Sequence, residues 1–366
     1  GALSQNPKNA TGENRMLPFT IYSKQINQGS ILASSTTKRP GIITNVDVTA
    51  TILNHFNLPY NLTMGRPFSI SFQKYNPLKF LSYLNRRISF VYDARTPLVK
   101  TYVLSQIIVV LAAIPILLFL PNLAPIMKQI LLILTSYPLS LLLLGAFNTD
   151  YMVLYTFISL AITASIVYLS NKITKNWLIS FMFIGFLTAF TILVDLATGT
   201  KLAQFSPLSY QAITGARYYG IGNEYMGVLI GSIMVSCSIA YHLYQNLLTK
   251  IIITISLIIT TLFIALPQLG INFGGTIAAI CTFSFAVLNK RFSADKIFKL
   301  GTLIFACIAI IIMYDLTRNI EAQSHLARTA FLIKEQGFSE LWLIITRKIA
   351  MNIKLIKYTS WSRVFL

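Results

Sequence analysis

Eight long apolar runs constrain the fold of this 366-residue chain more than any other feature of its sequence. Each run is close to the roughly 20 residues that a helix needs to cross the hydrocarbon core of a bilayer. Only 11% of the residues are charged, whereas a soluble globular protein carries about 25%. The sequence therefore predicts a mainly α-helical, polytopic membrane bundle with spans near residues 102–120, 127–147, 151–170, 177–195, 224–244, 250–269, 271–289 and 298–316.

The chain is strongly basic, with a net charge of +19. Such a charge can indicate nucleic-acid binding, but in a membrane protein basic loops beside anionic headgroups are the commoner cause. The predicted partners are therefore the lipid bilayer and its anionic headgroups, and not nucleic acid. The cysteines all lie inside apolar runs and are interpreted as packing residues, with no disulfide framework or metal site: Cys237, Cys281 and Cys307.

The basic residues of the short loops predict the orientation of the bundle, because cytoplasmic loops carry an excess of lysine and arginine. Loops on the other side of the predicted membrane contribute only Lys201 and Arg217. The side with the excess carries Lys128, Lys172, Lys175, Lys250, Lys290, Arg291, Lys296 and Lys299. We therefore expect a multi-pass protein of the cell membrane whose N-terminal region is extracytoplasmic.

The residues before the first apolar run have a different pattern. Runs at 17–22 and 41–46 are typical of β-strands, and a helix is expected from Val48 to Phe56 with Asp47 capping it. So few elements cannot form a core of their own, which indicates the end of a larger α/β domain. Because the chain also starts without Met and ends on an apolar stretch, we expect it to be a fragment.

Four regions follow from these patterns. A basic, aromatic stretch precedes the first span and is interpreted as a juxtamembrane segment against headgroups. The residues after the last span are interpreted as an amphipathic tail. The predicted regions are an extracytoplasmic α/β remnant at 1–72, the juxtamembrane segment at 73–100, the transmembrane bundle at 101–316 and the tail at 317–366.

One stretch of the first region resembles a known family. The run Arg39–Leu53, followed by Asn57-Leu58-Pro59 and Gly65-Arg66-Pro67 and preceded by Leu17–Ile21, resembles the C-terminal part of the alkaline phosphatase superfamily. That superfamily includes sulfatases, phosphonate hydrolases and cofactor-independent phosphoglycerate mutases. The resemblance implies a strand, an Asp-initiated helix and a Gly-containing turn.

The same resemblance implies where the family's chemistry would lie. The nucleophile and most metal ligands of the family would be upstream of this chain, so a metal ion is a cofactor only if that upstream part is catalytic. The late metal-binding histidine of the mutase branch would fall near Gly12 or Glu13, where the sequence has no histidine. Asp47 would start a helix and would not be a ligand. The segment is then either a remnant of a catalytic domain or a scaffold without chemistry.

Ionisable residues at the span ends supply the candidate binding site, since charge within a membrane is costly and usually functional. Under the predicted orientation, Asp195, Glu224 and Asp315 all reach the extracytoplasmic side. Two Gly-rich turns, 215–227 and 270–276, lie on the same side. The candidate substrate-binding residues are Arg217, Asn223, Glu224, Asp195, Asp315, Asn272 and His325; catalytic residues are not identified.

Each candidate also has a structural interpretation. The 215–227 loop can bind an anion through Arg217, with Glu224 as base or counter-ion. Alternatively it is a packed turn in which Arg217 pairs with Glu224 or Asp195. The 270–276 turn is either a tight helix hairpin or the second lip of a shared cavity.

Two functions from different classes fit these features. The first is a membrane-anchored hydrolase or transferase that acts on a phosphorylated or lipid-linked envelope substrate. The second is a transporter or flippase with an outward-facing polar cavity, and a non-catalytic anchor is a further alternative. Mid-span segments that are nearly free of charge favour the first.

Overall fold

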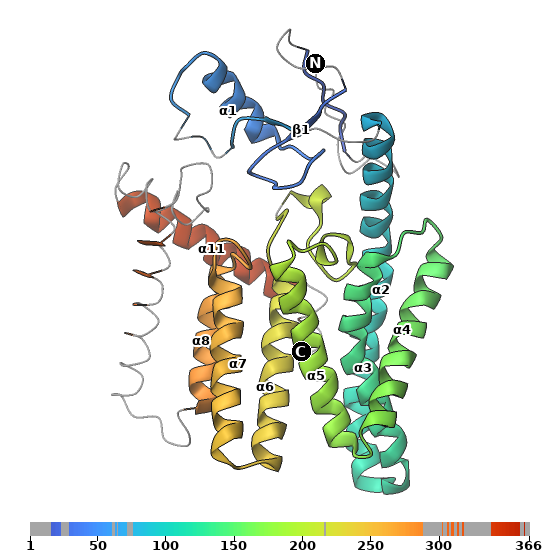
Figure 1. Ribbon diagram of the computed structural model, residues 1–366. Coiled ribbons are helices and arrows are strands. Elements are labelled where there is room, and N and C mark those ends of the chain that lie inside the picture. The colour runs from blue at the N-terminus through green and yellow to red at the C-terminus, as the bar shows by residue number, and fades with distance from the viewer. Residues whose placement is uncertain are drawn as a thin grey trace.

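The computed structural model describes residues 16–22, 29–60, 63, 65–71, 76–215, 217–287 and 338–358, with isolated positions after 301. Within these residues the protein is mainly helical. An upright bundle forms most of the molecule, and a small segment with short strands covers one end of it (Figure 1). We call residues 29–71 the head segment and the end of the bundle that it covers the head end.

Seven described helices make up the bundle. Six of them are long and apolar enough to cross a membrane, whereas the described part of α8 is shorter. The predicted eighth span lies outside the described residues, apart from isolated positions, so the structure supports a multi-pass membrane protein but does not confirm eight spans. The helices are α2 (Pro77–Phe119), α3 (Ala124–Leu143), α4 (Met152–Ile173), α5 (Trp177–Ala197), α6 (Asn223–Leu243), α7 (Leu247–Ala265) and α8 (Phe273–Val287).

Asparagine side chains start three of these helices. The Asn76 side chain accepts hydrogen bonds from the main-chain N–H groups of the first turn of α2, where Pro77 follows it. Asn176 and Asn246 cap α5 and α7 in the same way, at 2.9 and 2.8 Å. These caps satisfy N–H groups that a helix leaves without partners at its beginning.

Successive helices of the bundle run antiparallel (Figure 1), and α5 packs closely against α6. A Cβ atom at Gly185 would lie 2.1 Å from the Ser236 hydroxyl oxygen and 3.1 Å from the Ser232 carbonyl oxygen, so glycine permits this close approach without movement of Ser236. The bundle core around this contact is apolar and includes Leu196, Leu229 and Ile233. Because of the alternation, the α3–α4, α5–α6 and α7–α8 connections all lie at the head end (Figure 1).

Helix α2 runs without a break through the expected boundary at residue 100. Its 43 residues span roughly 65 Å at 1.5 Å per residue, about twice the hydrocarbon thickness of a bilayer. Its first half therefore extends beside the head segment (Figure 1). The basic stretch interpreted as lying against headgroups instead directs Arg87 and Arg95 into protein contacts.

The head segment differs from the predicted strands. Neither 17–22 nor 41–46 is a strand; the strands are β1 (Ile31–Ala33) and β2 (Ser69–Ser71), paired antiparallel. At 41–46 the prediction was wrong because residues 34–42 form a turn closed by their own hydrogen bonds, and helix α1 follows directly. In that turn the buried Thr37 hydroxyl donates to the Ile42 carbonyl at 2.7 Å, and Gly41 has a φ of +83°.

The predicted helix is present but begins earlier. Helix α1 spans Asn45–His55, with Thr44 as its N-cap and Asp47 inside its first turn. Asp47 is fully buried and accepts hydrogen bonds from the main-chain N–H groups of Thr44 and Arg66 at 2.9 Å each. The carboxylate therefore ties the helix start to the chain before β2, which is a structural role.

The tail contains the expected helix. Helix α11 (Phe338–Tyr358) lies across the head end at an angle to the bundle helices (Figure 1). Its apolar Trp342 and Ile353 side chains are exposed, and Lys354 and Lys357 lie near its end. This pattern is typical of a helix at a membrane interface.

Candidate functional site

The α5–α6 loop, residues 198–222, folds over the head end and gathers most of the candidate residues. It contains two short 3-10 turns, η4 (Ala203–Phe205) and η5 (Ala212–Thr214). Helix α2, the head segment and the α7–α8 turn all contact this loop, as the following contacts show. The candidate site is therefore built from residues far apart in the sequence.

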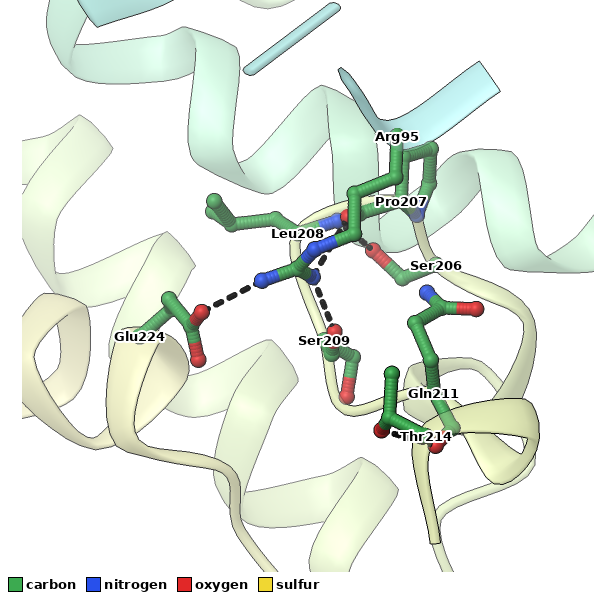
Figure 2. A network of polar contacts seen from close by, with 8 residues as sticks. All are labelled: Arg95, Ser206, Pro207, Leu208, Ser209, Gln211, Thr214 and Glu224. Atoms are coloured by element: carbon green, nitrogen blue, oxygen red, sulfur yellow. Dashed lines mark hydrogen bonds and ion pairs between the residues drawn. The ribbon is translucent and has the colours of Figure 1, made fainter. Parts of the chain in front are cut away.

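Arg95 of α2 lies at the centre of this arrangement. Its Nη2 atom is 2.5 Å from Glu224 Oε1, and both side chains are about three-quarters buried. Its Nη1 atom donates to the carbonyl oxygen of Pro207 at 2.9 Å and to that of Ser209 (Figure 2). One guanidinium thus joins α2, the α5–α6 loop and the first turn of α6.

Asp195 closes the beginning of the α5–α6 loop. Its two carboxylate oxygens accept hydrogen bonds from the main-chain N–H groups of Leu202 at 2.7 Å and Ala203 at 2.9 Å. The residue is 4% exposed, and its main-chain carbonyl accepts from Thr200. Both carboxylate oxygens therefore hold the loop, and Asp195 has a structural role.

The two Gly-rich turns contact each other directly. The main-chain N–H group of Ile221 donates to the Gly270 carbonyl at 2.9 Å, and a Cβ atom at Gly220 would lie 2.4 Å from that carbonyl oxygen. Gly220 also has a φ of +75°, which glycine adopts readily. Asn272 donates to the Ile221 carbonyl and to Asn223 Oδ1, at 3.2 Å each.

Arg217 completes this junction. Its Nη1 atom donates to the carbonyl oxygens of Gly270 at 3.4 Å and Ile271 at 3.3 Å. Burial lowers the pKa of the Arg217 guanidinium, although Tyr210 and Tyr219 oppose this shift. Neither acid named in the packed-turn alternative binds Arg217 here, because Arg95 pairs with Glu224 and main-chain N–H groups bind both carboxylate oxygens of Asp195.

The candidates are thus brought together in part. Asp195, Arg217, Asn223, Glu224 and Asn272 all belong to the loop, its flanking helix ends or the turn beside it. Burial raises the pKa of the Tyr210 hydroxyl, which donates a hydrogen bond to the Thr200 hydroxyl in the same loop at 3.1 Å. Asp315 and His325 lie outside the described residues.

Three arginines that were not among the candidates also face the loop: Arg39, Arg87 and Arg95. Arg39 and Arg87 both lie against the ring of Phe205, with Cζ atoms 5.3 and 3.8 Å from its centroid. Arg87 also donates to the carbonyl oxygens of Gly145 at 2.5 Å and Phe147 at 3.4 Å. The head end is therefore rich in guanidinium groups held in fixed positions.

No cluster of three or more His, Cys, Asp or Glu side chains that could hold a metal ion occurs among the residues the structure describes. No family model, curated protein or solved structure matches the chain. Chemically, the arrangement is suited to holding an anion by guanidinium groups.

Proposed function

We propose that this chain is the membrane part of an envelope protein that acts, as a hydrolase or transferase, on a phosphorylated or lipid-linked substrate. Its six apolar helices are compatible with an integral membrane protein. The substrate would be held at the head end, which under the proposed orientation is extracytoplasmic. The bond-breaking groups would come from a part of the protein upstream of this chain, resembling the alkaline phosphatase superfamily.

The observation that carries this proposal is the convergence of arginines on the α5–α6 loop. Arg39, Arg87, Arg95 and Arg217 come from three parts of the chain and contact this loop or the turn beside it. Guanidinium groups match the geometry of phosphate oxygens and bind them by paired hydrogen bonds. Lipid phosphates lie at the depth where the ends of spanning helices meet the headgroups.

The interior of the bundle favours this function over transport. The buried polar side chains in the middle of the described helices are hydroxyl groups, such as Ser140, Thr163 and Thr188, and the latter two donate to carbonyls of their own helix. A transporter for a charged substrate needs ionisable groups along its path. In the described part of α3 to α7 the acidic side chains lie at helix ends, as Asp195 and Glu224 do.

Comparison of membrane lipids with and without the protein tests the proposal. Cells that lack the full-length protein should accumulate a phosphorylated or lipid-linked envelope species, measured by mass spectrometry of lipid extracts. Expression of the wild-type protein should restore the normal level. The purified full-length protein should then convert that species and release phosphate or a phosphorylated product.

Unchanged lipid extracts and no conversion by the purified protein would contradict the proposal. A labelled substrate that crosses reconstituted vesicles chemically unaltered would instead support the transporter alternative. A protein that does neither would be a membrane anchor.

A further inference from the structure

Two arginines from separate elements share one aromatic ring. Arg39 comes from the turn of the head segment, and Arg87 comes from the extended first half of α2. Their Cζ atoms lie 5.3 and 3.8 Å from the centroid of Phe205, which belongs to the α5–α6 loop. Cation–π attraction to one ring stabilises each cation, but it does not remove the repulsion between two like charges.

Parts of both guanidinium groups are buried without a hydrogen-bond partner among the protein atoms of the described residues. These atoms are Nη2 of Arg39 and Nε of Arg87. The whole Arg39 residue is only 6% exposed. A buried N–H group that makes no hydrogen bond costs about 1–3 kcal/mol, and more when it is charged. Such groups in a native structure require an explanation.

No carboxylate in the described part of the chain neutralises this pair. Glu224 binds Arg95, Asp150 binds Arg86 at 3.3 Å, and the carboxylate oxygens of Asp195 are taken by main-chain N–H groups. Burial lowers the pKa of the Arg39 guanidinium, and the neighbouring Arg87 cation lowers it further, whereas Tyr210 opposes both. The pair therefore carries positive charge without a carboxylate partner in the described residues, at a site where Arg39 is buried and Arg87 is partly buried.

The surrounding elements hold these side chains in place. The turn of the head segment is closed by the buried Thr37, so the backbone around Arg39 is fixed. Ile42 and Ile88 pack with Phe205 in one apolar cluster, which joins the head segment, α2 and the α5–α6 loop. Lys38, next to Arg39, has its Nζ atom 4.2 Å from the centroid of the Tyr219 ring in the same loop.

We propose that Arg39 and Arg87 together bind a phosphate group beside the Phe205 ring, against which both guanidinium groups lie. The ligand is a phosphate monoester or diphosphate, carried either by a lipid headgroup or by a soluble ester. The unpartnered Nη2 and Nε atoms donate to the phosphate oxygens, and the anion neutralises the two cations. The phosphate site itself is inferred from the contacts of Arg39 and Arg87. Only the identity of the molecule that carries the phosphate rests on the proposed function.

Binding measurements on the purified chain test this site. Inorganic phosphate and pyrophosphate are titrated into the protein in detergent, with binding followed by calorimetry and by the shift in Tm. Arg39→Gln and Arg87→Gln should each weaken binding by about tenfold or more, the loss expected for one charge-assisted hydrogen-bonding group. The matched control is Arg86→Gln, because Arg86 is next to Arg87 in the sequence but pairs with Asp150 at the surface. The Arg86→Gln variant should bind phosphate and pyrophosphate as tightly as the wild type.

A lipid arm separates the two sources of the phosphate group. The protein is placed in nanodiscs of phosphatidylcholine with or without phosphatidic acid, and lipids that remain bound are measured by native mass spectrometry. Retention of phosphatidic acid that Arg39→Gln abolishes supports a lipid phosphate. Binding of inorganic phosphate or pyrophosphate without retained phosphatidic acid supports a soluble ester.

The stability of the ligand-free variant separates binding from folding. If Arg39 is an uncompensated cation, Arg39→Gln should leave the ligand-free Tm unchanged or raise it, because a charge without a partner is removed. If that variant misfolds, Arg39→Lys keeps the charge and should still weaken binding, because lysine lacks the planar fork. The proposal is overturned if inorganic phosphate, pyrophosphate and phosphatidic acid all fail to bind. It is also overturned if Arg39→Gln and Arg87→Gln both bind these ligands as tightly as the wild type. Phosphate binding without any substrate conversion would leave this site in place and contradict only the proposed function.

Discussion

Replacement of Arg95 by methionine tests whether the ion pair with Glu224 holds the α5–α6 loop on the bundle. The change keeps the apolar stem of the side chain and removes the guanidinium. It leaves the Glu224 carboxylate without its cation and the Pro207 and Ser209 carbonyl oxygens without their donor. The two side chains of the pair are 25% and 23% exposed, so water can reach only part of the abandoned carboxylate.

The magnitude follows from that burial. Loss of one partner of a fully buried pair costs about 3–5 kcal/mol. Partial exposure reduces the cost, and Glu224 lies in the first turn of α6, where the helix dipole stabilises a negative charge. We therefore expect Arg95→Met to lower the free energy of unfolding by about 2–3 kcal/mol.

A double-mutant cycle in detergent measures the interaction itself. Arg95→Met, Glu224→Gln and the double variant are unfolded by titration with a denaturing detergent, and the coupling energy should be about 1–3 kcal/mol. The control cycle uses Arg86 and Asp150, whose side chains are 52% and 42% exposed, and should give less than about 1 kcal/mol. Equal coupling energies for the two pairs would refute the reasoning, since burial would then have no effect.

Three further predictions concern the same end of the protein. Asp195→Asn should destabilise by about 1–3 kcal/mol, because an amide can accept only one of the two main-chain hydrogen bonds; hydrogen exchange should then rise in residues 198–205 and not elsewhere. Gly220→Ala should lower the Tm, because the new Cβ atom would lie 2.4 Å from the Gly270 carbonyl oxygen and the residue has a φ of +75°. The control Gly227→Ala, with open space around its Cβ position, should leave the Tm unchanged. Similar Tm values for the two variants would contradict this close approach. In intact cells an impermeant thiol reagent should label a cysteine at Arg217 and not one at Lys250, and the reverse pattern would invert the orientation.

Hydrophobic runs were sufficient to predict the bundle. Six of the predicted spans correspond to α2–α7, and each predicted boundary after the first span lies within a few residues of the helix. The reason is physical: a helix in lipid must satisfy its own backbone and expose apolar side chains, so length and composition alone identify it. The exception is α2, which begins at Pro77 and not at the predicted residue 102. Its first half carries several charged residues and is therefore not apolar enough to be identified as a membrane span.

The sequence also contains a signal at Arg95. Leu84, Ile88, Val91 and Leu98 form a buried stripe along α2 at helical spacing, and Arg95 interrupts it. A cation within an apolar stripe indicates a partner on the packed side of the helix. Composition alone instead suggested that the whole basic stretch lies against lipid headgroups. Composition does not show which face of the helix each basic side chain occupies, and that face decides whether the side chain meets protein or lipid.

Partners across long sequence separations were decided only by the tertiary structure. Arg95 and Glu224 are 129 positions apart, and no local pattern states that the loop after α5 folds back onto α2. The nearest acids in the sequence suggested partners for Arg217, but carbonyl oxygens of the α7–α8 turn lie closer in space. Residue types and hydropathy thus determined that the chain forms a membrane bundle with charge at its ends. Which charges meet depends on helix packing and loop closure, and among the described residues no carboxylate pairs with Arg39 or Arg87.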